Sequence, residues 1–195
     1  IIEDEGILPQ CLYNADQTGL YYTKLPSKVY IDKEERVTTN GTKQMKSKDR
    51  LTLMVATAAN GEKLPLAMIG KSAKPTCFKF CGGVPPMFYK NQKNAWFDRS
   101  ITVWWLNTVF WPSHLKKHGN VKALLLLDNC SAHFVDRQLV MAPEDKLKIV
   151  FFPPNMTSNH QPADMGMIAT IKVGYKASLL RTLLKIFDEE GGFEK

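Results

Sequence analysis

The chain has 195 residues, of which 44% are hydrophobic and 10% aromatic, and its formal net charge at pH 7 is +7. This length and composition predict one soluble, globular domain with a proper core, and nothing in them demands a second domain. The basic balance indicates an anionic partner such as nucleic acid, with a merely solvated basic surface as the alternative.

The sequence contains no membrane or secretion signal. No apolar window approaches the length of a transmembrane helix, and the acidic start Ile1–Gly6 is the opposite of the positive start of a signal peptide. We therefore expect a protein that stays inside the cell and has no membrane partner. Because the first residue is Ile1 and not Met, we also expect a piece of a longer protein.

The four cysteines are scattered and do not indicate a disulfide framework, in agreement with a reducing compartment. Cys77 and Cys81 are followed by His114 and His118, which is a possible zinc-ligand pattern. The stretch between the two pairs far exceeds the linker of a zinc finger. Thiols in the core or on the surface are therefore favoured over a zinc site.

The first predicted element is a strand within Gln10–Tyr22, where apolar and polar residues alternate. Asp16 lies inside it, although aspartate is disfavoured in strand interiors. Either Asn14–Gly19 forms a turn, or the carboxylate is held there for a purpose. The polar and basic segment Leu25–Arg50 is predicted to be a loop or edge segment that either contacts phosphates or forms a solvated face.

A β-hairpin is predicted next. Two strand-like runs, Leu51–Ala58 and Lys63–Ile69, flank the dipeptide Asn60-Gly61, which is a strong hairpin signal. Residues 70–98 then contain prolines and glycines too often for a regular element.

Residues 100–119 predict a helix with a break near its middle. Ser100 is the expected N-cap, Pro112 is expected to end or kink the helix, and Gly119 is expected to close it. Its many aromatic side chains are expected in the core rather than in a base-stacking platform.

The segment Leu124–His133, with the sequence LLLLDNCSAH, is the one around which we expect the fold to be arranged. Four consecutive leucines fit a strand that is buried on both faces of a sheet and delivers Asp128 to its carboxyl end. Asp128 is then either the N-cap of a following helix or a metal-binding or catalytic acid. An aspartyl-phosphate phosphatase would need a second aspartate two positions on, where Cys130 stands.

The last third of the chain predicts a short helix, a strand, a loop and a long helix. The short helix lies around Phe134–Met141, the strand is Lys146–Phe152, and the loop is Asn155–Pro162. A helix follows from Asp164, which would place its carboxylate in the first turn, where the helix dipole favours it. The apolar stripe of this helix comprises Ile168, Ile171, Tyr175, Leu179, Leu183 and Ile186.

Three carboxylates, those of Asp16, Asp128 and Asp164, would converge if the first strand and the leucine strand are neighbours and the last helix packs over their ends. Carboxylates in contact raise one another's pKa and need a cation. Oxygen ligands without Cys or His indicate Mg²⁺ or Mn²⁺. Two such ions can clamp the attacking and leaving oxygens of a phosphodiester.

These residues carry a resemblance to a known family. The strings NADQTG (residues 14–19), DNCSAH (residues 128–133) and NMTSNHQPADMG (residues 155–166) resemble the DDE endonuclease domain of pogo-like transposons, which include Tigger and jerky-type proteins and centromere protein B. The motif order, the hairpin between the first two motifs and the 35 residues between Asp128 and Asp164 fit the family pattern. The resemblance extends from about Leu12 to Leu184.

The resemblance implies an α/β, RNase H-like fold with a mixed five-stranded sheet and helices on both faces, formed by residues 1–195 as a single domain. It implies a two-metal transposase site at Asp16, Asp128 and Asp164, with Asn129 and His133 either orienting the site or serving as structural hydrogen-bond residues. Water would cleave the phosphodiester at a transposon end, and the freed 3′-hydroxyl would attack target DNA. Helix-turn-helix modules would lie upstream, outside this fragment.

The expected partner is DNA, bound mainly through its phosphates in the nucleus, with homo-oligomers formed on paired ends. The sequence departs from the family at Gln17, where a glutamate is usual, and at His160 and Ala163, where apolar residues are expected. None of these changes removes an acid, so metal-dependent cleavage is the favoured function. The alternative is a domesticated, catalytically silent relative that acts as a nuclear DNA-binding or scaffolding protein.

Overall fold

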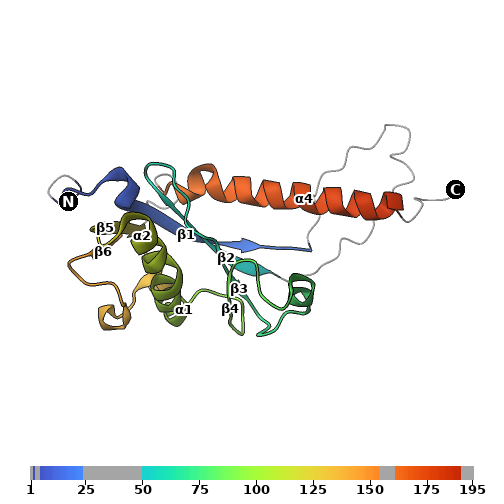
Figure 1. Cartoon of the computed structure of the whole chain (residues 1–195), viewed down its shortest axis with the longest axis horizontal. Coiled ribbons are helices and arrows are strands. Elements are labelled where there is room, and N and C mark those ends of the chain that lie inside the picture. Colours follow the sequence, from blue (N-terminus) through green and yellow to red (C-terminus); the bar gives the residue numbers. More distant parts are fainter. Residues whose placement is uncertain (1, 3–4, 24–49, 154–160, 190–195) are drawn as a thin grey trace.

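A six-stranded mixed sheet forms the centre of the molecule (Figure 1). The computed structural model describes residues 2, 5–23, 50–153 and 161–189. The strands are β1 (Leu12–Leu20), β2 (Leu51–Ala58), β3 (Ala67–Gly70), β4 (Phe88–Asn91), β5 (Ala123–Leu127) and β6 (Leu147–Phe151). Their spatial order is β4-β3-β2-β1-β5-β6. Most of the predicted segments Leu25–Arg50 and Asn155–Pro162 lies outside the described residues.

The sheet combines antiparallel and parallel pairs, as predicted. Strand β2 is antiparallel to β1 and β3, whereas β5 is parallel to β1 and β6. Strand β4 extends the edge in parallel to β3, so the sheet has one strand more than expected. The prediction that residues 70–98 lack regular structure was wrong for β4 and for a 3-10 helix at Thr76–Cys81.

Helices cover both faces of the sheet (Figure 1). One face packs against α1 (Arg99–Trp105), a π-helical turn (Leu106–Phe110) and α2 (Trp111–His118), which follow one another directly. The other face carries α4 (Ile168–Glu189), whose first residue, Ile168, packs in a cluster with Val55 of β2. Among the described helices, none is both long enough and apolar enough to cross a bilayer.

The main core lies between the sheet and the α1–α2 segment. It combines Leu125 and Leu127 of β5 with Trp105 and Phe110, all of which are fully buried. The prediction that the aromatic residues of this helical segment belong to the core is confirmed for these two side chains. The prediction that β5 is buried on both faces is also confirmed, since Leu124 packs into a separate cluster on the opposite face.

The helical segment differs from its prediction at its start. Asp98, not Ser100, is the N-cap, because the Asp98 carboxylate accepts a hydrogen bond from the Ile101 N–H at 2.9 Å. The Ser100 hydroxyl instead donates to the same carboxylate at 2.7 Å. The sequence prediction chose a capping residue two positions after the actual N-cap.

Pro112 does not end the segment, which continues through α2, and Gly119 closes it, as predicted. A proline has no N–H to donate to the carbonyl four residues earlier, and the helix widens into the π-helical turn Leu106–Phe110 immediately before it. The short helical piece predicted around Phe134–Met141 is confirmed as a 3-10 helix at Arg137–Leu139, which is shorter than the predicted range.

The hairpin prediction is confirmed. Strands β2 and β3 pair antiparallel, and the loop between them contains Gly61 with a φ of 89°, a conformation that favours glycine. The register of the bridge between Thr57 and Lys63 is shifted by one residue relative to the pairing of Thr52 with Ile69. The segment that leads into β3 therefore contains one residue more than the facing part of β2.

Leu125 provides a direct test of the buried central strand. Leu125→Ala should lower the free energy of unfolding by about 2–5 kcal/mol, because the cavity it leaves lies between two packed layers. Leu139→Ala is the matched control, since Leu139 is 59% exposed and its truncation should change stability by less than ~0.5 kcal/mol. Urea denaturation followed by circular dichroism measures both. Equal losses for the two variants would contradict this account of the core.

Candidate active site

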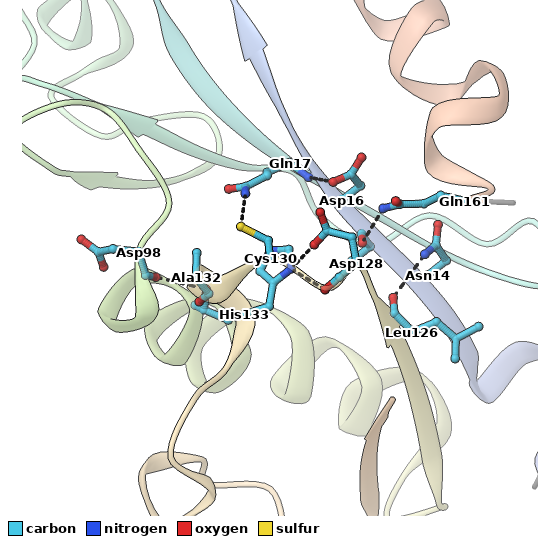
Figure 2. A network of polar contacts seen from close by, with 12 residues as sticks. Asn14, Asp16, Gln17, Asp98, Leu126, Asp128, Cys130, Ala132, His133 and Gln161 are labelled. Atoms are coloured by element: carbon cyan, nitrogen blue, oxygen red, sulfur yellow. Dashed lines mark hydrogen bonds and ion pairs between the residues drawn. The ribbon is translucent and has the colours of Figure 1, made fainter. Parts of the chain in front are cut away.

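Asp16 and Asp128 come from neighbouring parallel strands. Asn14 of β1 pairs with Leu126 of β5, and the same register continued by two residues sets Asp16 beside Asp128, which directly follows β5. Side chains two positions apart in a strand project from the same face. Figure 2 shows the two carboxylates near one another where β5 ends. The alternative of a turn at Asn14–Gly19 was wrong, because β1 runs without interruption.

Asp164 joins this region from the start of α4. It lies in a π-helical turn, Ala163–Met167, whose backbone is kinked at Gly166 with a φ of 134°, a value that favours glycine. The Asp164 side chain is exposed, whereas Asp16 is only 6% exposed. Asp164 is close enough for its charge to act on the Asp16 carboxyl.

The pKa of the Asp16 carboxyl is raised to about 7, chiefly because burial removes it from water. On the adjacent strand β2, Asp16 is paired with Val55, which packs with Ala163 and Ile168 in an apolar cluster. The charges of Asp128 and Asp164 raise the pKa further. The Gln17 N–H, which donates to Asp16 Oδ1 at 2.6 Å, and the positive field of His133 act in the opposite direction.

Asp128 is paired with His133, which is fully buried. The His133 Nδ1 atom contacts Asp128 Oδ1 and also lies 3.3 Å from the Asp128 carbonyl oxygen. Within the described residues, Asp128 Oδ1 has no hydrogen bond of good geometry. Asn129, the other residue expected to orient the site, is exposed.

The loop after Asp128 is held by α1, a contact that the sequence did not predict. The Arg99 side chain donates to the Ser131 carbonyl at 3.2 Å, and the Thr102 hydroxyl donates to the Ala132 carbonyl at 2.9 Å. Both acceptors belong to the 3-10 helix Ser131–His133. These bonds fix the loop that carries His133, and no sequence signal connects α1 with this loop.

Two buried amides, Asn14 and Gln161, also border the acids and were missed. Asn14 is 5% exposed and Gln161 is fully buried. Gln161 Nε2 donates weakly to the Ala15 carbonyl at 3.5 Å, which links the start of the last helix to β1. The period of the strand could have identified Asn14, since it lies two residues before Asp16 and therefore on the same face.

The donor set suits a hard cation, because it consists of carboxylate oxygens. As the side chains lie, no group of three His, Cys, Asp or Glu residues in the described chain closes around one point. Asp16 and Asp128 form the inner pair, and Asp164 stands further out toward solvent. A metal that used all three acids would therefore require Asp164 to turn inward.

Two alternative interpretations from the sequence do not hold. Asp128 is not the cap of a following helix, because the 3-10 helix Ser131–His133 has Cys130 at its N-cap position and no side-chain cap bond. The zinc alternative also fails, because both ring nitrogens of His114 are engaged, one by the Tyr13 hydroxyl at 3.0 Å and the other by the Val121 carbonyl at 2.8 Å.

The raised pKa of Asp16 predicts a pH-dependent stability in the absence of divalent metal. The ordinary pKa is 3.8, so between pH 4 and about 7 the folded protein binds more protons than the unfolded chain. Stability is therefore full at low pH and falls as pH rises through this window. Asp16→Asn should raise the free energy of unfolding at pH 8, by about 2–4 kcal/mol at most, and should change it little at pH 4.

Urea denaturation at pH 4, 6 and 8 measures this difference. Asp145→Asn is the control, because the Asp145 side chain is 73% exposed and should show no comparable trend. A wild-type protein that is as stable as Asp16→Asn at pH 8 would contradict the desolvation of Asp16.

Several curated proteins are similar to the chain over most of its length. Human Tigger transposable element-derived protein 7 is 32% identical over 97% of this chain and 35% of its own length. Human Jerky protein homolog is 36% identical over 84% of this chain and 29% of its own length. Human major centromere autoantigen B is 24% identical over 90% of this chain and 26% of its own length. The chain thus spans about a third or less of each of these relatives.

A solved structure, the Mos1 transposase paired-end complex with left transposon end, resembles the fold. Its TM-score is 0.58 at 11% sequence identity, with 96% of this chain and 50% of that chain covered. This likeness confirms the predicted RNase H-like fold. The family described as DDE superfamily endonuclease matches residues 48–192, more than half of the chain, including Asp128 and Asp164 but not Asp16. The chain therefore belongs to the DDE superfamily endonuclease family.

Proposed function

We propose that this domain is a transposase-type endonuclease that cleaves phosphodiesters of DNA at a divalent-metal site formed by Asp16, Asp128 and Asp164. The observation that carries the proposal is geometric. The pairing of Asn14 with Leu126, continued by two residues, sets Asp16 beside Asp128, and the Asn14 side chain accepts a hydrogen bond from the Ala163 N–H, one residue before Asp164. A fold that only needed stability would not gain from burying one carboxylate near two others.

Mg²⁺ or Mn²⁺ fits this donor set better than zinc does, because the acids offer only hard oxygen ligands. Asp16 and Asp128 would hold the cation, and Asp164 would complete the site from the helix side. When bound, divalent cations supply charge stabilisation at the attacking and leaving oxygens of the phosphodiester. His133 would orient the Asp128 carboxylate through the contact at its Nδ1 atom.

The proposed substrate is DNA, bound mainly through phosphates and without strong sequence choice by this domain. The formal charge of +7 supports an anionic partner. The Mos1 structure of similar fold is a paired-end complex with a transposon end, which supports action on DNA ends. Homo-oligomers on paired ends belong to the proposal. Such a role would be carried out in the nucleus. Strand transfer by the freed 3′-hydroxyl belongs to the same proposal.

A second candidate is a domesticated domain that binds DNA or acts as a scaffold without cleaving it. The names of two relatives favour it, since one is a transposable element-derived protein and the other is a centromere autoantigen. The two candidates share the fold and the basic charge. They differ in whether the three acids bind metal and support cleavage.

Nicking of supercoiled plasmid in the presence of Mn²⁺ or Mg²⁺ distinguishes the two candidates. The wild-type chain should convert supercoiled to open-circular DNA. Asp128→Ala should lower the rate by about 100-fold or more, because the loss of one acidic ligand removes the charge that holds the cation. Asp145→Ala is the control, because it removes an exposed carboxylate and should retain full activity.

Each outcome of the nicking assay decides between the candidates. Equal background cleavage by wild type and Asp128→Ala would eliminate the enzyme for this domain. Calorimetry with Mn²⁺ provides an independent measurement, because the proposed site should bind the ion in the wild type and lose affinity in Asp128→Ala even when cleavage is slow.

DNA binding through phosphates predicts a steep dependence on salt. The affinity for a short duplex should fall as a power of the salt concentration, with a slope of about −0.9 for each phosphate contacted, and should differ little between unrelated sequences. Fluorescence anisotropy measures the slope between 50 and 200 mM salt. This is about the range over which such interfaces lose most of their affinity. A flat salt response would contradict this mode of DNA binding.

A further inference from the structure

One buried amide, that of Asn14, joins the three segments that carry the acids. Asn14 belongs to β1, two residues before Asp16, and is 5% exposed. Its Nδ2 atom donates to the Leu126 carbonyl at 3.2 Å, two residues before Asp128. Its Oδ1 atom accepts a hydrogen bond from the Ala163 N–H at 2.9 Å, one residue before Asp164. Figure 2 shows Asn14 beside the end of β5.

These two bonds are of different kinds. The bond to Leu126 reinforces a place where β1 and β5 are already paired, since Asn14 and Leu126 are partners in the parallel register. The bond to Ala163 lies within the apolar cluster of Val55, Ala163 and Ile168, where its loss would leave a buried N–H without a partner. The turn that carries Asp164 is therefore fixed to the sheet at Ala163 by the Asn14 side chain.

The chemistry of the residue matters as much as its position. Only a side chain with one donor and one acceptor can serve a carbonyl on one side and an N–H on the other, and a carboxamide has both in one plane. An aspartate at this position would keep the acceptor for Ala163 and lose the donor for Leu126. A leucine of similar volume would lose both.

We propose that Asn14 is a positioning residue of the acid site. Its side chain binds the backbone two residues before Asp128 and one residue before Asp164, and it thereby holds these two acids near Asp16. The proposal rests on the proposed function, because the constellation matters only if the acids act together on a cation. Asn14 itself touches neither the cation nor the substrate.

The test measures backbone protection and metal affinity in the full chain. Asn14→Leu should abolish the protection of the Ala163 amide from hydrogen exchange, followed by NMR. It should also weaken Mn²⁺ binding about 10-fold or more, as the loss of residues that orient metal ligands commonly does. Thr52→Val is the matched control, because it deletes the buried bond of Thr52 Oγ1 to the Ala95 carbonyl, at 2.6 Å, outside the site. It should retain both properties.

Asn14→Asp separates a positioning role from general destabilisation. It keeps the acceptor for Ala163, so the Ala163 amide should remain protected, in contrast to Asn14→Leu. This variant also decides the matter if Asn14→Leu does not fold, because exposure of the Ala163 amide in a folded Asn14→Asp protein would overturn the proposal.

The failure of each proposal has its own signature. A wild-type chain that binds no Mn²⁺ would overturn the proposed function, and the exchange of the Ala163 amide would still decide whether Asn14 holds the turn. Wild-type Mn²⁺ affinity in Asn14→Leu, or an Ala163 amide that stays protected in it, would overturn the positioning role while leaving the proposed function intact.

Discussion

The parallel pairing of β1 with β5 is the constraint on which the site depends. The register that pairs Asn14 with Leu126 brings Asp16 opposite the residue that follows β5, which is Asp128. A slip of one residue would turn the side chains of one strand to the opposite face and separate the acids. The apolar packing of β5 on both faces prevents such a slip, because it would bring leucines of one cluster into the other.

This arrangement opposes stability locally. Asp16 is removed from water beside Val55 and Ala163 and is near two other carboxylates, and its pKa of about 7 is the result. Two surrounding groups act in the opposite direction and lower the pKa of Asp16: the Gln17 N–H, which donates to its carboxylate, and His133, through its electrostatic effect. The core between the sheet and the α1–α2 segment provides the stability that allows such a cluster to persist.

The sequence predicted the elements that depend on a local pattern of residues. It did not predict the elements and contacts that depend on residues far apart in the chain. The leucine strand, the hairpin around Gly61 and the acid at the end of β5 were predictable, because periodicity and turn chemistry act over a few residues. Strand β4 was not, because its pairing with β3 arises across a segment rich in proline and glycine. The contacts of α1 with the loop after Asp128 span about 30 residues and leave no periodic trace.

The three acids differ in burial, and the difference follows from the elements that carry them. Asp16 lies inside a central strand and is buried, Asp128 follows a strand end and is half-buried, and Asp164 lies in a helical turn and is exposed. A sheet fixes side-chain positions through pairing on both sides, whereas the turn of Asp164 is attached to β1 through side-chain amides. The rigid half of the site is therefore the sheet pair, and the site meets solvent on the side of Asp164.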